Sequence, residues 1–363
     1  MVTFLMVLIL FGAVLEMLSL WDSIADLRYR CTPSKLGCEP GEVFSLNTVL
    51  SNYGPRTISF LQMEELFPKQ IKLQGVEEMP LGEHRCCLHA SVLYIRGRQK
   101  ITRTLQVSLP DRGVYAFEGC RLIRGDFLGI KEKCKEVAQH EEIIIFPRLL
   151  SEDNVLNALS GYYGDFSSRR FYIEDPVLVN SYLDYTGREP LRSISWTQSA
   201  RRNQLMVKEF DHTMDMSVTI LLDVYLHWSD GARLEELEYC FSLARTIAEF
   251  MEKKRVSYRL LTNAFIRSES SSYLGLQKAG QGAHHYTTLL YTLGQAGADS
   301  FRDADNLYQM AVANYAGENA IFYVAPFVTE KRQQLVTSLN KRLGSQIYPM
   351  YAASLMEVKQ NAV

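Results

Sequence analysis

Apolar and polar residues alternate along much of the first half of the chain. In residues 42–52, Phe44, Leu46 and Leu50 alternate with serine and asparagine, and residues 85–94 and 100–109 repeat the pattern. Such alternation places the apolar side chains on one face of a β-strand. Turn sequences at 52–55 and 111–113 separate the runs. The pattern predicts an antiparallel β-sandwich-like domain over residues 28–150.

The period changes over residues 213–352. Residues 217–223 form an apolar run ending in Asp223, which is typical of a strand buried on both faces. In residues 234–254, apolar residues recur every three to four positions and predict a helix. Alternating strands and helices predict a parallel, doubly wound sheet. Further strands are predicted at 256–264, 320–326 and 346–351, and further helices at 286–295, 303–315 and 329–343.

Residues 151–212, between these two regions, are less regular. They contain two glycine-containing turns, at 160–161 and 163–165. We interpret this stretch as a connector with a short motif of its own.

The first 21 residues are predicted to form a transmembrane helix. Residues 1–15 carry no charge, Glu16 lies near one end, and Trp21 is typical of an interfacial anchor. A helix of about 20 apolar residues is just long enough to cross the hydrocarbon core. A cleaved secretory signal is the alternative, but no basic residue precedes the apolar run and no clear cleavage site follows it.

The charges that flank this segment predict its orientation. Nothing basic precedes it, whereas Arg28, Arg30 and Lys35 follow it. The positive-inside rule therefore predicts a single-pass protein of the cell membrane with its C-terminal body in the cytoplasm.

The composition of the chain argues against a nucleic-acid-binding protein and against a structural metal site. The 363 residues carry a net charge of −2, so no basic excess is available to grip a nucleic-acid backbone. The seven cysteines are an odd number and contain no Cys-x-x-Cys or zinc-finger spacing. We interpret them as free thiols in a reducing compartment, with no structural metal site.

The most specific motif lies in residues 182–223, YLDYTGREPLRSISWTQSARRNQLMVKEFDHTMDMSVTILLD. This stretch resembles the signature of the bacterial domain-of-unknown-function 58 family. In that signature, a Tyr-x-x-Gly, an Arg, an Ile-x-Trp and an Ala-Arg precede an apolar strand that ends in Asp. Shorter similarities at 39–42, 112–115, 125–130 and 146–147 extend the resemblance over about residues 28–350. The matching positions are Tyr185 (or Tyr182), Gly187, Arg192, Ile194, Trp196, Ala200 and Arg201.

The resemblance implies a fold and a role. It implies a membrane-anchored protein with a β-domain and a C-terminal von Willebrand factor A-like domain. It also implies a gene often found beside a MoxR-type AAA+ ATPase, with a supposed role in assembling or maturing other complexes and no enzymatic activity. Two departures stand out: one predicted membrane helix where many relatives have two, and Arg188-Glu189 after Gly187 where relatives commonly have Asp.

Asp223 is the one candidate metal ligand. An A-type domain can hold a divalent cation through Asp-x-Ser-x-Ser, which supplies hard oxygen ligands. Here Tyr225 and His227 replace both serines, so we expect no intact metal site. The alternative role of Asp223 is to order the loop at the sheet's switch point.

Trp196 with Arg192 and Arg201 allows two interpretations. Trp and Arg dominate the energetics of protein interfaces, so these residues could form a docking surface. Alternatively, Trp196 packs internally on a strand and the arginines pair with Glu189 or Glu209. We favour this internal clamp, because Ile194 and Trp196 would share one face of a strand.

No motif of an enzyme is found. The Gly-Gln-Gly at 280–282 lacks the third glycine of a dinucleotide loop, and no Gly-x-Ser-x-Gly elbow is present. The sequence therefore predicts an α+β multidomain protein: a transmembrane helix, a β-sandwich-like domain, a connector and an A-type domain. We expect a non-enzymatic protein-binding module without cofactors, whose partner is a protein such as a MoxR-type AAA+ ATPase, and not a nucleic acid. The alternatives are cation-dependent adhesion through the A-type domain and an uncharacterised hydrolase.

Overall fold

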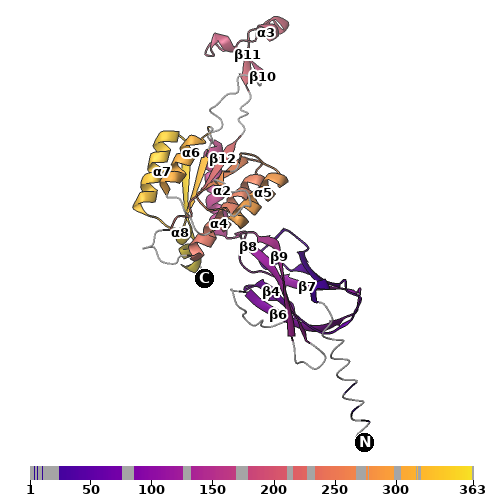
Figure 1. The fold of residues 1–363 in the computed structure, drawn as a ribbon. Helices are drawn as coiled ribbons and strands as arrows, with labels where there is room; N and C mark the ends of the chain where they lie inside the picture. Colours follow the sequence, from indigo (N-terminus) through magenta and orange to yellow (C-terminus); the bar gives the residue numbers. More distant parts are fainter. Residues whose placement is uncertain are drawn as a thin grey trace. The chain divides into compact units, whose positions relative to one another are not determined.

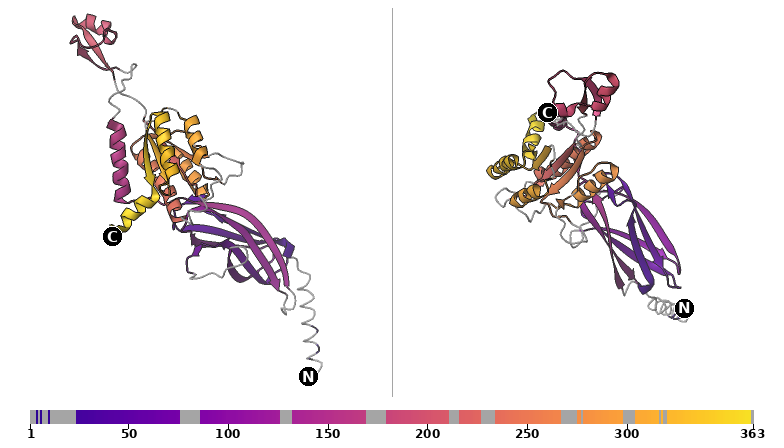
Figure 2. Two further views of the ribbon diagram at one scale, coloured as in Figure 1. Left: turned by 90° about the vertical axis from the view of Figure 1, so that its left-hand side faces the viewer. Right: turned by 90° about the horizontal axis from the view of Figure 1, so that it is seen from above.

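A computed structural model gives the architecture of the chain (Figures 1 and 2). It describes residues 24–75, 86–125, 132–168, 179–210, 216–226, 234–266, 275–276, 278–297, 304–315, 317 and 320–361, and Phe4, Met6 and Leu10 of the first 23 residues. The chain divides into two compact units. The first comprises residues up to Arg148 with Leu293–Gln295, and the second comprises the rest.

The first unit contains two sheets. One has the strand order β1-β3-β7-β5 and the other β2-β9-β8-β4-β6. All pairs are antiparallel except β2 with β9. The strands of the first sheet are β1 (Leu27–Pro33), β3 (Phe44–Asn52), β5 (Lys72–Leu73) and β7 (Lys100–Ser108). Those of the second are β2 (Gly37–Cys38), β4 (Ile58–Pro68), β6 (Cys86–Ile95), β8 (Gly113–Gly125) and β9 (Glu132–Ile145), and a short 3₁₀ turn, η1 (Ile24–Asp26), precedes β1.

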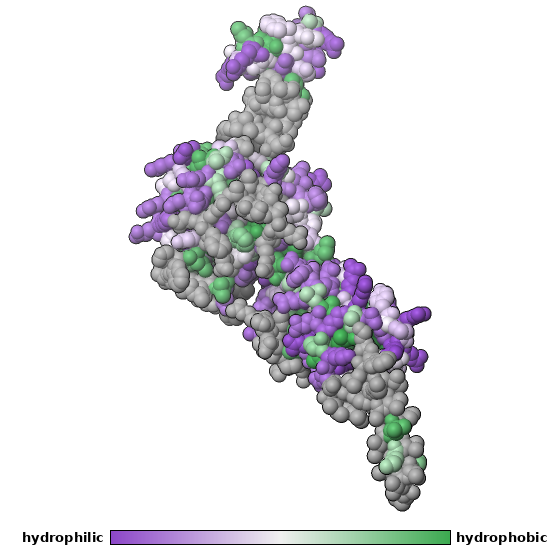
Figure 3. All heavy atoms as spheres, in the orientation of Figure 1, coloured by the Kyte–Doolittle hydropathy of each residue, from purple (hydrophilic) through white to green (hydrophobic). Residues whose placement is uncertain are grey.

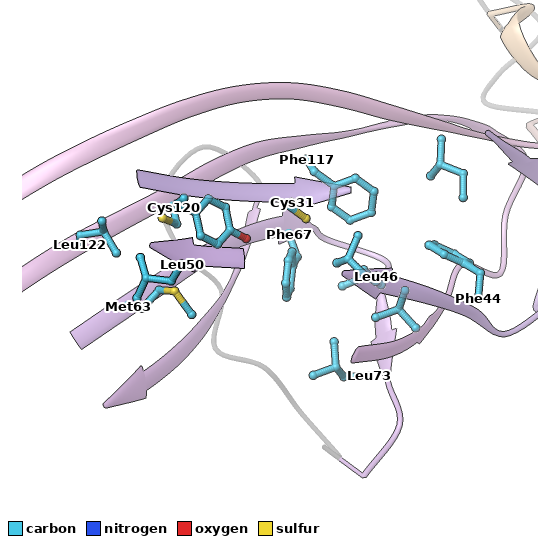
Figure 4. Close-up of a cluster of buried hydrophobic side chains, with 14 of the residues drawn as sticks. Cys31, Phe44, Leu46, Leu50, Met63, Phe67, Leu73, Phe117, Cys120 and Leu122 are labelled. Atoms are coloured by element: carbon cyan, nitrogen blue, oxygen red, sulfur yellow. The ribbon is translucent and has the colours of Figure 1, made fainter. Parts of the chain in front are cut away.

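One hydrophobic core draws on both of these sheets. Leu46 and Leu50 of β3 are buried together with Met63 and Phe67 of β4 and Phe117 of β8 (Figure 4). Burial alternates strictly along β3, because every second side chain of a strand points to the same face. The alternation seen in the sequence thus supplies the contacts that hold the two sheets together.

The second unit is built on a five-stranded sheet in the order β14-β13-β12-β15-β16. The pairs among β13, β12, β15 and β16 are parallel, and β14 pairs antiparallel with β13. These strands are β12 (Ser217–Leu222), β13 (Ser257–Thr262), β14 (Gly275–Leu276), β15 (Ala320–Ala325) and β16 (Gln346–Tyr351). The helices of this unit are α2 (Asp153–Ser168), α3 (Trp196–Arg202), α4 (Leu234–Lys253), α5 (Ala283–Gln295, whose last three residues belong to the first unit), α6 (Ala304–Ala313), α7 (Glu330–Leu343) and α8 (Ala352–Asn361).

Helices α6 and α7 cover one face of this sheet. Leu307 of α6 and Leu335 of α7 share a buried cluster with Leu221 of β12 and Tyr323 of β15. All six residues of β15 are buried. A strand that is covered on both faces reads as a continuous apolar run, which explains why β12 and β15 show no alternation.

The predicted fold class is wrong. Within the described residues, no helix has the length and apolar character needed to span a bilayer. The predicted span at residues 1–21 falls almost wholly outside the described residues; Phe4, Met6 and Leu10 are helical there and exposed. The prediction of a single-pass membrane protein with its C-terminal body in the cytoplasm is therefore wrong as well.

The predicted parallel, doubly wound A-type domain also needs correction. The described chain is rich in strands that form four separate sheets, and the sheet of the second unit is mixed because β14 runs antiparallel at its edge. β14 is two residues long, too short for any periodic signal. The two turns predicted at 160–161 and 163–165 are also wrong, because both positions lie inside α2.

Candidate functional site

The first part of the sequence motif, residues 182–210, lies in a small module of residues 179–210, and the end of the motif forms β12 of the five-stranded sheet. β10 (Val179–Asp184) pairs antiparallel with β11 (Met206–Phe210), and Ile194 forms an isolated bridge to Val207 on the other edge of β11. Ile194 and Val207 are both buried. A 3₁₀ turn, η4 (Leu191–Ser193), and helix α3 complete the module.

Hydrogen bonds fasten α3 to β11. The Ser195 N–H donates to the Met206 carbonyl at 2.8 Å. Ser199 Oγ donates to the Ser195 carbonyl at 2.8 Å and accepts from the Met206 N–H at 2.9 Å. Both serines are buried. Because these bonds fix both ends of the loop that carries α3, the first residue of the helix, Trp196, has a defined position on the module.

Gly187 permits the turn that follows β10. Its φ of +87° lies in the region that L-residues rarely adopt. The Glu189 carboxylate closes the same turn, since it accepts from the Thr186 N–H at 3.0 Å and from Thr186 Oγ1 at 2.7 Å. The hydrogen bond from Thr186 lowers the pKa of Glu189 below its usual value. Tyr185 joins the module through its N–H, which donates to the Leu205 carbonyl at 2.9 Å.

Trp196 is exposed. It is the first residue of α3 and retains 67% of its surface accessible. The predicted internal clamp is therefore wrong, because the strand assumed for 192–196 is a 3₁₀ turn, two extended residues and then a helix. Ile194 is buried, whereas Trp196 is exposed because it begins α3.

Other large apolar side chains of the module are exposed as well. Leu183 is 54% exposed, Leu191 69% and Leu205 43%. Figure 3 shows hydrophobic residues at the surface of this module among hydrophilic ones. An isolated exposed leucine is ordinary, so the exposed Trp196 is the residue that marks a candidate interaction site.

The arginines of the module do not pair with its acids. Arg188, Arg192, Arg201 and Arg202 are exposed, and within the described part of the chain none of them forms an ion pair. Glu189 is bound to Thr186, and the Glu209 carboxylate accepts from Ser181 Oγ. The cations are thus free to meet a partner. We call Trp196, Leu191, Arg192, Ala200, Arg201 and Arg202 the docking surface.

Asp223, the candidate metal ligand, lies immediately after β12 and is fully buried. Its Oδ1 accepts from Asn263 Nδ2 at 2.8 Å and from the Tyr225 N–H at 3.1 Å. Its Oδ2 accepts from the Tyr323 hydroxyl at 2.8 Å and from Arg332 Nε at 2.9 Å. Four donors therefore saturate the carboxylate.

Arg332 supplies the positive charge at this position. Its Nη1 donates to the Phe327 carbonyl at 3.1 Å and its Nη2 to the Tyr225 carbonyl at 2.5 Å. Burial on its own would lower the pKa of Arg332, but the charge and hydrogen bond of Asp223 raise it above its usual value. Burial, together with the negative charge of Asp223, raises the pKa of the Tyr323 hydroxyl far above its usual range.

The residues around Asp223 do not fit a divalent cation. A guanidinium already neutralises the carboxylate, and both of its oxygens are committed to protein donors. The Tyr225 backbone contributes one donor and one acceptor to this network, and His227 lies outside the described residues. Across the described residues, no group of three or more His, Cys, Asp and Glu side chains could hold a metal ion. The arrangement orders the loop after β12.

Sequence reasoning missed Arg332. It lies 109 positions after Asp223, in the first turn of an α7 sequence that reads as a polar surface helix. No local pattern marks such a residue as buried.

Comparisons with known proteins do not show a family for this chain. No family model matches the chain. Among curated proteins, the chain is similar to the uncharacterised protein YeaD of Bacillus subtilis (strain 168), with 24% identity over 126 residues. The similarity covers 35% of this chain and 32% of that protein, so the chain spans about a third of the length of the relative it matches.

The solved structures that are similar to this chain include two isolated domains. The CARDB domain of the PF1109 protein from Pyrococcus furiosus, solved in complex with di-metal ions, has 9% identity and a TM-score of 0.21 and covers 33% of this chain and 87% of that one. The GAE domain of GGA2p from Saccharomyces cerevisiae has 11% identity and a TM-score of 0.22 and covers 33% and 93%. TM-scores this low carry no conclusion about fold or function.

Proposed function

We propose that this chain is a non-enzymatic protein-binding module that assists the assembly or maturation of other proteins together with a MoxR-type AAA+ ATPase. The observation that carries the binding role is the exposure of Trp196 on a rigidly fastened helix, beside arginines without ion-pair partners. Trp and Arg are the residues most enriched at the energetic centres of protein interfaces. The choice of an ATPase partner rests on the resemblance of the 182–223 motif to the domain-of-unknown-function 58 family.

A direct binding measurement tests this proposal. The full chain would be titrated with a purified MoxR-type ATPase encoded in the same genome, by isothermal calorimetry with and without ATP. We expect Trp196→Ala to weaken binding by about 2 kcal/mol or more, roughly thirtyfold, which is the loss typical of a central interface residue. Its unfolding midpoint should stay close to wild type, since the side chain is largely exposed.

Leu234→Ala is the matched control. Leu234 is also the first residue of a helix and is 56% exposed, but it lies on α4 rather than on the docking surface. It should leave the affinity unchanged. A wild-type chain that does not bind the ATPase, or a Trp196→Ala chain that binds as tightly as wild type, would contradict the proposal.

A further inference from the structure

The module and the whole chain differ in the sign of their charge. Residues 179–210 contain five basic and three acidic side chains, a net charge of +2, whereas the chain as a whole carries −2. The acids Glu189 and Glu209 are also engaged by Thr186 and Ser181 within the module. Hydrogen bonds from neutral hydroxyl groups leave these carboxylates charged, so the net charge of the module stays at +2.

Arg201 and Arg202 lie five and six residues after Trp196, so at 3.6 residues per turn they are rotated about 140° and about 120° from the ring, to opposite sides of the helix. Trp196 begins α3, and Arg201 and Arg202 form its last turn. At about 1.5 Å of rise per residue, the ring and the guanidinium groups originate roughly 8–9 Å apart along the helix axis. Ala200 lies four residues after Trp196, so it shares a helix face with the ring and adds only a methyl group beside it.

We infer that the docking surface binds an acidic protein segment: an apolar side chain or pocket receives Trp196, and carboxylates that reach around the last turn of α3 receive Arg201 and Arg202. This inference rests on the proposed protein-binding function and specifies the chemistry of the partner. Arginine forks pair with carboxylates in two parallel hydrogen bonds, which fixes orientation as well as affinity. Complementary charge also speeds encounter and rejects basic partners.

A protein partner is favoured over a polyanion. Because the module carries +2, the remainder of the chain carries −4 and would repel a nucleic acid or an anionic membrane surface that extends beyond the module. The exposed leucines Leu183 and Leu191 suit an apolar protein surface. A short acidic segment meets only the positive module.

A peptide assay tests the inference without the ATPase. A fluorescein-labelled helical peptide of alternating Glu and Leu faces would be titrated with the full chain by fluorescence anisotropy, beside the same peptide with Lys for Glu. We expect the Glu peptide to bind at least tenfold more tightly than the Lys peptide. Arg201→Glu with Arg202→Glu should weaken it at least tenfold at 50 mM salt, and the difference should shrink at 500 mM salt.

A matched control is available on another helix. Lys341 and Arg342 are exposed and form the last turn of α7, as Arg201 and Arg202 do in α3. Lys341→Glu with Arg342→Glu changes the charge by the same amount and should leave peptide binding within twofold of wild type. Equal losses in the two double variants, or no binding of the Glu peptide, would overturn the inference.

The binding of other ligands to the docking surface would give results that differ from those expected for an acidic protein segment. Tighter binding of a single-stranded oligonucleotide or of phosphatidylglycerol vesicles than of the Glu peptide would overturn the inference, as would self-association of the chain that Arg201→Glu abolishes. The two proposals also fail separately. If the ATPase binds through Trp196 but ignores the reversal of Arg201 and Arg202, the acidic partner is wrong and the binding function stands. If the Glu peptide binds as expected and the ATPase does not, the choice of ATPase is wrong.

Discussion

Replacing Arg332 with methionine should destabilise the second unit severely. The substitution keeps most of the side-chain volume but removes the cation whose Nε lies 2.9 Å from Asp223 Oδ2. Asp223 has no exposed surface, so its charge would remain buried and unpaired. Removing one partner of a buried ion pair costs about 3–5 kcal/mol. Asp223 keeps three of its four hydrogen bonds, which puts the expected loss near the lower end, about 3 kcal/mol.

A double variant distinguishes a lost charge pair from lost packing. Asp223→Asn removes the stranded charge, so adding it to Arg332→Met should cost less than the two single substitutions predict together. We expect a coupling of about 1–3 kcal/mol, the range for residues of one hydrogen-bonded network. Urea unfolding at pH 7 with far-ultraviolet circular dichroism measures each free energy.

The control for Arg332 lies on the same helix. Arg342 is exposed near the end of α7, and Arg342→Met should change the free energy of unfolding by no more than about 0.5 kcal/mol. If Arg332→Met lost less than about 1 kcal/mol, or if the double variant were strictly additive, the reasoning about a buried carboxylate neutralised by arginine would be refuted.

Three further predictions concern the two units. Burial lowers the pKa of His89 below its ordinary value of 6.5, so its contribution to stability is present above pH 6.5 and is lost as the pH falls through the folded-state pKa. His89→Gln should therefore flatten the decline of the unfolding free energy between pH 7.5 and 5. A decline parallel to that of the wild type would contradict this prediction. Gly119 has φ +114°, and an added Cβ would lie 2.0 Å from the Val137 carbonyl oxygen. Gly119→Ala should therefore lower the free energy of unfolding in urea by about 3 kcal/mol or more. A loss no greater than that of Gly41→Ala, where the space around the glycine is open, would contradict the clash. Thr329 caps α7, so Thr329→Ala should lose about 1 kcal/mol and Thr329→Ser much less, and equal losses would count against the cap.

The regular elements were the most predictable part of the fold. The three-to-four spacing at 234–254 predicts a helix, and α4 spans Leu234–Lys253. The alternation in 42–52 predicts a strand, and β3 spans Phe44–Asn52. Both signals arise because a buried face must repeat with the period of its own backbone. α2 was not predicted although Val155, Leu159 and Tyr162 recur at helical spacing, because its two glycines were interpreted as turns. The two-residue β14 is too short to show a repeat.

The membrane prediction failed for a different reason. It rested on the length of an uncharged apolar run and on the positions of Glu16 and Trp21, and these sequence features do not establish a helix that crosses a bilayer. Within the part of the chain that is described, none qualifies.

The candidate site was predictable as a set of residues but not as a geometry. Residues 182–210 of the motif do fold into one module. The three residues Ile194-Ser195-Trp196 are too few to show whether they form a strand or the start of a helix, and α3 places Trp196 on the surface. At Asp223, Tyr225 and His227 in place of the two serines predict that no intact metal site is present, and this stays a prediction. Arg332 supplies the positive charge beside Asp223 that a metal cation would otherwise supply. It lies on α7, 109 positions later in the sequence, and only the tertiary structure brings it within hydrogen-bonding distance of Asp223.

Site-specific photocrosslinking tests the central claim, that residues 179–210 form a protein-docking surface, most directly. A photoreactive benzoylphenylalanine would replace Trp196 in the full chain, and the same residue would replace Leu234 in a control chain of matched exposure. Irradiation with the MoxR-type ATPase should give a covalent adduct from position 196 and none above background from position 234, and Arg201→Glu should reduce its yield. Equal crosslinking from the two positions, or none from position 196 while the chain binds the ATPase, would contradict the claim.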